Sequence, residues 1–144
     1  MLLETNKEKR VNEQPHILVV DENEDNGTMM AALLGQIGYA AATTRSVADA
    51  LKAAHDRPPA LYVLDSYFSD GRGTDLCQQL CANDSQATVI FYSCEFDRAD
   101  FEAALRAGAR AYIIKPDIDE LLQTIAICMS PVGDSTNQPA LYCN

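Results

Sequence analysis

The chain has 144 residues, 47% of them hydrophobic, which is enough for one folded domain with a single core. Its 21 acidic and 11 basic residues give a net charge of −10, which argues against binding through the phosphates of a nucleic acid. The polar N-terminus and the short apolar stretches argue against a signal peptide and a membrane anchor. Five cysteines without a disulfide framework favour reduced thiols and a cytoplasmic location.

Hydrophobic periodicity predicts alternating strands and helices over residues 16–129. Flexible segments are expected on either side, an N-terminal arm (1–15) and a C-terminal tail (130–144). In chain order, we expect a strand at 16–21, a helix around 29–37, a weaker strand at 39–44, a helix at 46–55, a strand at 61–64, a helix at 74–81, a strand at 88–93, a helix at 97–107, a strand at 111–114 and a helix at 117–128.

These elements indicate an α/β fold. Strands and helices alternate five times, and the strands are apolar throughout instead of alternating with polar residues. Such strands are typical of a parallel sheet that is covered by helices on both faces. Right-handed crossovers then predict a doubly wound, five-stranded parallel sheet, in which a ligand binds at the carboxyl ends of the strands.

Charged and polar side chains follow these strand ends. Asp21 and Glu22 follow the first strand, Asp65 the third, Ser93 ends the fourth, and Lys115 follows the fifth. Two carboxylates about 4 Å apart repel each other by roughly 4 kcal/mol, so the three acids need a cation or a shared proton. Mg²⁺ suits a few carboxylates and often shares a phosphate oxygen. The set therefore predicts a phosphoryl site in which Asp65 is the candidate nucleophile.

Five short motifs carry a resemblance to a known family. They are Ile17–Glu22, Val63–Asp65, Asp70–Gly73, Val89–Ser93 and Gly108–Pro116. In order and spacing, from about His16 to Met129, they resemble the receiver domain of two-component response regulators. The resemblance implies a single receiver domain at 16–129 with the flavodoxin-like, CheY-like strand order 2-1-3-4-5.

The resemblance also implies a phosphoacceptor and a metal site. Asp65 would accept a phosphoryl group from a phosphohistidine on a sensor histidine kinase or a phosphotransfer protein. Glu22, Asp65 and the backbone carbonyl of Tyr67 would hold Mg²⁺, and Asp21 would help directly or through a water molecule.

A switch is implied as well. Ser93 and Lys115 would bind the phosphoryl oxygens, and Tyr112 would change rotamer as Ser93 moves inward. The face made by the fourth helix, the fifth strand and the fifth helix would then change for a downstream protein partner or for phosphorelay.

The sequence departs from the family at four places. Glu22 stands where Asp is more common, so the affinity for Mg²⁺ is expected to differ. Phe68 and Ser69 replace an aliphatic residue and a proline, which predicts a looser loop. Tyr67 is expected to shield the acyl phosphate from water, and the small Cys94 to leave the pocket open.

Other functions remain open at this point. The leading hypothesis is a phosphoacceptor that does not turn over a substrate. We expect it to stand alone, because 130–144 is too short for an output domain. The alternative is a degenerate receiver that acts as a phosphorylation-independent interaction module. A phosphatase of the haloacid dehalogenase type lacks its DxD pair, because Glu22 and Asn23 follow Asp21. A flavin site is disfavoured because the acidic segment 22–26 would repel the phosphate.

Overall fold

A computed structural model gives the fold of the chain, and it describes residues 16–130 and the short strand Leu141–Tyr142. The predicted N-terminal arm lies outside the described residues, as does most of the predicted C-terminal tail. The domain boundaries proposed from the sequence therefore stay predictions.

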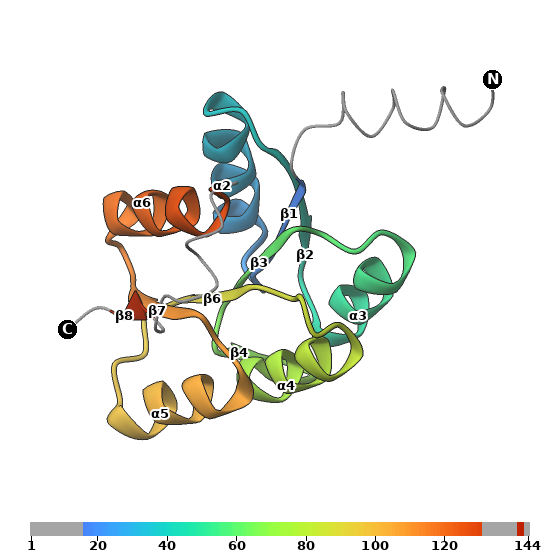
Figure 1. The fold of residues 1–144 in the computed structure, drawn as a ribbon, viewed down its shortest axis with the longest axis vertical. Coiled ribbons are helices and arrows are strands. Elements are labelled where there is room, and N and C mark those ends of the chain that lie inside the picture. The colour runs from blue at the N-terminus through green and yellow to red at the C-terminus, as the bar shows by residue number, and fades with distance from the viewer. Residues whose placement is uncertain (1–15, 131–140, 143–144) are drawn as a thin grey trace.

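Five parallel strands form the main sheet in the order β2-β1-β3-β6-β7, which confirms the predicted order 2-1-3-4-5 (Figure 1). Leu141–Tyr142 (β8) lies outside β7 and pairs with it in parallel, a contact that the sequence did not predict. The strands are β1 (His16–Val20), β2 (Ala40–Thr44), β3 (Leu61–Leu64), β6 (Val89–Ser93) and β7 (Ala111–Ile114), and a small hairpin is formed by β4 (Tyr67–Phe68) and β5 (Gly71–Arg72).

Helices cover both faces of the sheet, as predicted (Figure 1). They are α2 (Glu24–Gln36), α3 (Val47–Asp56), α4 (Gly73–Asn83), α5 (Arg98–Ala107) and α6 (Ile118–Cys128). Alternate side chains of β1 lie on opposite faces of the sheet. Ile17 and Val19 share a core cluster with residues of α2 and α6. Leu18 and Val20 share the other cluster with residues of α3, α4 and α5. Both faces of the strand are buried, which explains its continuous apolar sequence.

Side-chain caps and a glycine define the ends of α2 and α5. Asn23 begins α2, because its side chain accepts a hydrogen bond from the N–H of Asn26 (3.0 Å). Asp97 caps α5 by accepting from the N–H of Ala99 (2.9 Å), and Gly108 ends α5 with φ +112°. In the described part of the chain, no helix is long and apolar enough to cross a membrane.

Strand pairing brings the carboxyl ends of the strands to one edge. The N–H of Asp65 donates to the carbonyl of Val20 (3.1 Å), so β1 and β3 end side by side. The N–H of Lys115 donates to the carbonyl of Ser93 (2.9 Å), which aligns the ends of β6 and β7. The residues that follow these strands therefore meet at one edge of the sheet.

Candidate functional site

The charged cluster consists of Asp21, Asp65 and Lys115, from the ends of β1, β3 and β7. The Nζ atom of Lys115 donates to Oδ2 of Asp21 at 2.9 Å and to Oδ2 of Asp65 at 3.1 Å. The three side chains are 10%, 24% and 14% exposed, in that order, so Asp65 is the most open to solvent. Sequence reasoning predicted all three residues, and the structure places them in direct contact.

The charged cluster has an excess of negative charge that a cation could compensate. Burial opposes the positive charge of Lys115, but the hydrogen bonds and charges of Asp21 and Asp65 outweigh it and raise the pKa of Lys115. Two carboxylates face one ammonium group, so a negative charge is left uncompensated. The other oxygens accept from backbone: Oδ1 of Asp21 from the N–H of Asn23 (2.9 Å), and Oδ1 of Asp65 from the N–H of Ser66 (2.7 Å).

A hollow of about 590 Å³ lies over the charged cluster, and its lining includes Glu22, Tyr67 and Cys94. It therefore contains all four predicted metal ligands, and Cys94 lies at its exposed edge. Glu22 does not contact Lys115; its carboxylate instead accepts a hydrogen bond from the Ser69 hydroxyl. Ser69, which had no explanation in the sequence, thus orients a predicted metal ligand.

The donor set fits Mg²⁺ in its chemistry. Among the residues that the structure describes, no three His, Cys, Asp or Glu side chains lie close enough together to hold a metal ion by themselves. Lys115 lies between two of the candidate carboxylates, so a metal would share those carboxylates with it. Mg²⁺ keeps several of its water ligands and needs only one or two carboxylates, which this hollow offers.

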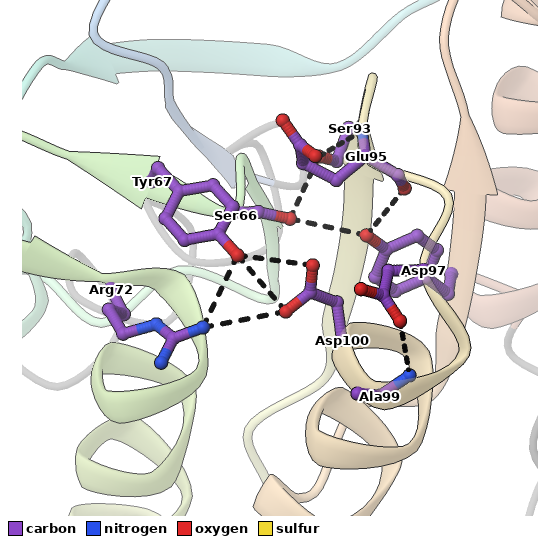
Figure 2. A network of polar contacts seen from close by, with 9 residues as sticks. Ser66, Tyr67, Arg72, Ser93, Glu95, Asp97, Ala99 and Asp100 are labelled. Atoms are coloured by element: carbon purple, nitrogen blue, oxygen red, sulfur yellow. Dashed lines mark hydrogen bonds and ion pairs between the residues drawn. The ribbon is translucent and has the colours of Figure 1, made fainter.

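A second group of polar residues, the hydroxyl cluster, lies on the other side of the end of β3. It consists of Ser66, Ser93 and Tyr112, which are 6%, 0% and 2% exposed. Ser66 Oγ donates to Ser93 Oγ at 2.8 Å, and Figure 2 shows these two side chains facing each other. Ser66 Oγ also lies 3.3 Å from Tyr112 Oη. Sequence reasoning missed Ser66. The alternation of side chains in extended backbone was the available signal, because it directs Asp65 and its neighbour to opposite sides.

Tyr112 points into the core. Its ring stacks on Phe91 with centroids 5.6 Å apart and meets Phe101 edge to face at 5.8 Å. Its hydroxyl donates to the backbone carbonyl of Glu95 (2.9 Å), and burial raises its pKa. The structure thus connects Tyr112 to Ser93 through Ser66, while the predicted change of rotamer stays a prediction.

The loop after Asp65 is held to two helices, α5 and α3. Tyr67 Oη donates to both carboxylate oxygens of Asp100 on α5 (3.1 Å each), and Arg72 contacts the same two residues (Figure 2). Asp70 accepts from the N–H groups of Val47 (2.9 Å) and Ala48 (3.0 Å) at the start of α3. The prediction of a looser loop did not take these hydrogen bonds into account.

Phe68 and Gly73 complete this loop. Phe68 is 8% exposed and belongs to the core, so its ring anchors the hairpin of β4 and β5 to the core. The N–H of Gly73 donates to the carbonyl of Ser66 (2.7 Å), and a Cβ at position 73 would lie 2.2 Å from the carbonyl oxygen of Asp65. Tyr67 is 43% exposed at the mouth of the hollow, and its shielding of an acyl phosphate stays a prediction.

Comparisons with known proteins agree with this geometry. Residues 17–126 match the family model of the response regulator receiver domain. The chain is 29% identical over 110 residues to the photosynthetic apparatus regulatory protein RegA of Rhodovulum sulfidophilum, which covers 76% of this chain and 60% of that protein. It is 32% identical over 100 residues to the DNA-binding response regulator MtrA of Mycolicibacterium paratuberculosis, covering 69% of this chain and 44% of that one.

The fold has solved counterparts. A CheY-like response regulator receiver domain protein from Methanospirillum hungatei superposes with a TM-score of 0.77 at 23% identity, covering 80% of this chain and 93% of that one. The chain spans 60% of the RegA protein and 44% of the MtrA protein, so it matches only part of each relative. The family match, the parallel sheet and the residues at its edge lead to one conclusion: the chain belongs to the receiver domain family of response regulators.

Proposed function

We propose that the chain is a phosphoacceptor switch in which Asp65 receives a phosphoryl group. The observation that carries this proposal is the contact of one ammonium group, that of Lys115, with Asp21 and Asp65 at 2.9 and 3.1 Å. Asp65 is the more exposed of the two acids and lies at the hollow, where a phosphodonor can reach it. Lys115 is then close enough to neutralise a phosphoryl oxygen on Asp65.

The phosphoryl transfer needs only the phosphohistidine and Asp65 as reactants. An oxygen of Asp65 attacks the phosphorus of a phosphohistidine, and the bond between phosphorus and nitrogen breaks. Its electron pair returns to the ring, which is protonated at its other nitrogen and leaves as neutral imidazole. Lys115 and Ser93 bind the phosphoryl oxygens on the chain.

Asp21, Glu22, Asp65 and the backbone carbonyl of Tyr67 would hold Mg²⁺, which supplies positive charge next to the phosphoryl oxygens. The chain's own share is to orient these carboxylates. Backbone N–H groups hold one oxygen each of Asp21 and Asp65, and Ser69 holds Glu22.

The donor in this proposal is a sensor histidine kinase or a phosphotransfer protein in the cytoplasm. The acceptor takes one phosphoryl group and does not turn over a substrate, apart from promoting its own phosphorylation and dephosphorylation. The output is a changed surface made by α5, β7 and α6, because Tyr112 of β7 packs on Phe101 of α5 and is connected to Ser93 through Ser66. A protein partner would bind there, or the phosphoryl group would pass on in a relay.

Intact-mass measurement with acetyl phosphate tests the proposal. We expect one phosphoryl group per chain in the presence of Mg²⁺, and none after Mg²⁺ is removed with EDTA. Asp65→Asn is expected to abolish the labelling. Asp75→Asn, which changes an exposed aspartate in the first turn of α4, is the matched control and should label as the wild type does.

Labelling that survives in Asp65→Asn would overturn the assignment of the acceptor. A chain that neither takes up phosphoryl groups nor responds to Mg²⁺ would instead be a phosphorylation-independent interaction module. Tyrosine fluorescence reports on Mg²⁺ binding, since the chain has six tyrosines and no tryptophan.

A further inference from the structure

Ser66 contacts three residues that the proposed switch uses. Its backbone N–H donates to Oδ1 of Asp65 (2.7 Å). Its hydroxyl donates to Ser93 Oγ at 2.8 Å (Figure 2). The same oxygen lies 3.3 Å from Tyr112 Oη. The residue is 6% exposed, so its hydroxyl interacts with these buried groups and not with bulk water.

Hydrogen-bond capacity gives the Ser66 hydroxyl a specific task. A serine hydroxyl has one hydrogen to donate and two lone pairs that accept. Ser93 Oγ accepts from Ser66 (2.8 Å) and from the N–H of Glu95 (3.1 Å), so both lone pairs are used. The hydrogen of Ser93 is therefore what it can offer to a phosphoryl oxygen. Without the Ser66 hydroxyl, one of the two contacts that fix the orientation of Ser93 is lost.

The same hydroxyl bears on the position of Tyr112. The phenol donates to the carbonyl of Glu95 (2.9 Å), which lies on the segment after β6. Ser66 Oγ lies 3.3 Å from the phenol oxygen at the end of β3. Because Ser66 donates its hydrogen to Ser93 and the phenol donates its hydrogen to Glu95, this approach is a packing contact and not a further hydrogen bond. A residue that only filled space would not need a hydroxyl here, since alanine is similar in volume and a buried polar group is costly without partners.

We propose that Ser66 is a positioning residue that joins the acceptor Asp65 to Ser93 and Tyr112. Its hydroxyl orients the hydrogen of Ser93 toward the phosphoryl group and packs against the phenol of Tyr112. The proposal rests on the proposed function of Asp65 and adds a residue that acts through Ser93 and does not itself touch the phosphoryl group.

Three variants test the proposal in the full chain. Ser66→Ala removes the hydroxyl, and Ser66→Thr restores it. Thr124→Val removes a buried hydroxyl from α6 (7% exposed) and is the matched control for a general loss of stability. The measurements are the rate of phosphorylation by acetyl phosphate with Mg²⁺, the Mg²⁺ affinity, and the NMR signals of the Tyr112 ring without Mg²⁺ and phosphodonor.

We expect Ser66→Ala to phosphorylate about fivefold more slowly, the effect of one neutral hydrogen bond. The Mg²⁺ affinity should stay within twofold, because Ser66 keeps the N–H that holds Asp65. The Tyr112 ring signals should shift or broaden as the ring samples other positions. Ser66→Thr should recover most of the rate, and Thr124→Val should resemble the wild type.

Other results would overturn the proposal. Wild-type rates and ring signals in Ser66→Ala would show that the hydroxyl has no such task, while the Asp65→Asn test would still support the acceptor. An equal loss of rate in Ser66→Ala and Thr124→Val, without recovery in Ser66→Thr, would mean a general structural effect. A wild-type chain that takes no phosphoryl group would overturn the proposed function itself and with it this proposal.

Discussion

The charged cluster and the hydroxyl cluster begin at adjacent residues, Asp65 and Ser66, yet they differ in every physical respect. The charged cluster opens to the hollow and balances two carboxylates against one ammonium group. The hydroxyl cluster is closed from solvent and neutral, and its members are at most 6% exposed.

The difference follows from the cost of burial. Unpaired charge is too costly to bury, so the groups that are proposed to meet a phosphodonor and a metal stay near water. Hydroxyl groups can be buried when they are hydrogen-bonded, so they can report on the acceptor from within the core. The end of β3 thus separates the exposed charged groups from the buried hydroxyl groups, and Ser93 is the member of the hydroxyl cluster that is proposed to reach the phosphoryl group.

A substitution at Gly73 should disturb both clusters and have the largest effect. A Cβ at this position would lie 2.2 Å from the carbonyl oxygen of Asp65 and 2.9 Å from the Phe91 ring, so backbone must move. We expect Gly73→Ala to lower the free energy of unfolding by about 3 kcal/mol in urea titrations.

Gly35→Ala is the matched control, because a Cβ there meets nothing within 4 Å and the residue lies in α2. This variant should gain about 0.5 kcal/mol. Equal stability of the two glycine variants would contradict the close approach at Gly73.

Lys115→Met should affect the charged cluster alone. Removing the ammonium group leaves Asp21 and Asp65 without their shared partner, and we expect a loss of about 2 kcal/mol in the absence of Mg²⁺. Added Mg²⁺ should restore much of this loss, because the cation replaces the missing charge. Urea titrations with and without Mg²⁺ measure both effects.

Lys52→Met serves as the control for Lys115→Met, since Lys52 is 79% exposed and pairs with Asp56 on the surface of α3. Its loss should be under about 0.5 kcal/mol and should not depend on Mg²⁺. A Lys115→Met chain as stable as the wild type without Mg²⁺ would show that the two carboxylates need no cation.

Tyr112→Phe should affect the hydroxyl cluster alone. The ring contacts with Phe91 and Phe101 persist, and only the hydrogen bond to the Glu95 carbonyl is lost, at a cost of about 1 kcal/mol. The Mg²⁺ affinity, measured by calorimetry, should stay within twofold. A larger change in affinity would mean that the two clusters are not separable.

Alkaline pH should destabilise both clusters, and its effect on the free energy of unfolding should be the smallest of those predicted here. Lys115 and Tyr112 both have raised pKa values, so the folded chain holds these protons more tightly than the unfolded chain does. Their contribution is complete at neutral pH and is lost as the pH rises through the raised pKa values. We expect the free energy of unfolding to decrease as the pH rises above 10.

Variants separate the contributions to this alkaline loss. Lys115→Met and Tyr112→Phe should each make the decrease shallower, and so should Tyr62→Phe, since burial, Asp84 and Cys81 raise the pKa of Tyr62 to about 12. Unfolding curves at fixed pH provide the measurement. A free energy of unfolding that rises above pH 10 would contradict the raised pKa values.

The sequence predicted what depends on local patterns. Continuous apolar strands indicate a parallel sheet, and its strand ends then predicted that Asp21, Asp65 and Lys115 would meet. Features that depend on side chains distant in the sequence were not predictable. The contact of Asp70 with α3 and the pairing of β8 with β7 both join segments that are distant in the sequence.

Asp70 has a consequence for chemoselectivity. The acceptor loop carries two aspartates within six residues, and both reach toward its surface. The oxygens of Asp70 accept from the N–H groups of Val47 and Ala48, and these bonds lower the pKa of Asp70. One lone pair on each oxygen is engaged at the start of α3, and these hydrogen bonds make the carboxylate a weaker competitor for a metal or for phosphorus. The loop contains two carboxylates of the same kind, and we expect only Asp65 to act as a nucleophile.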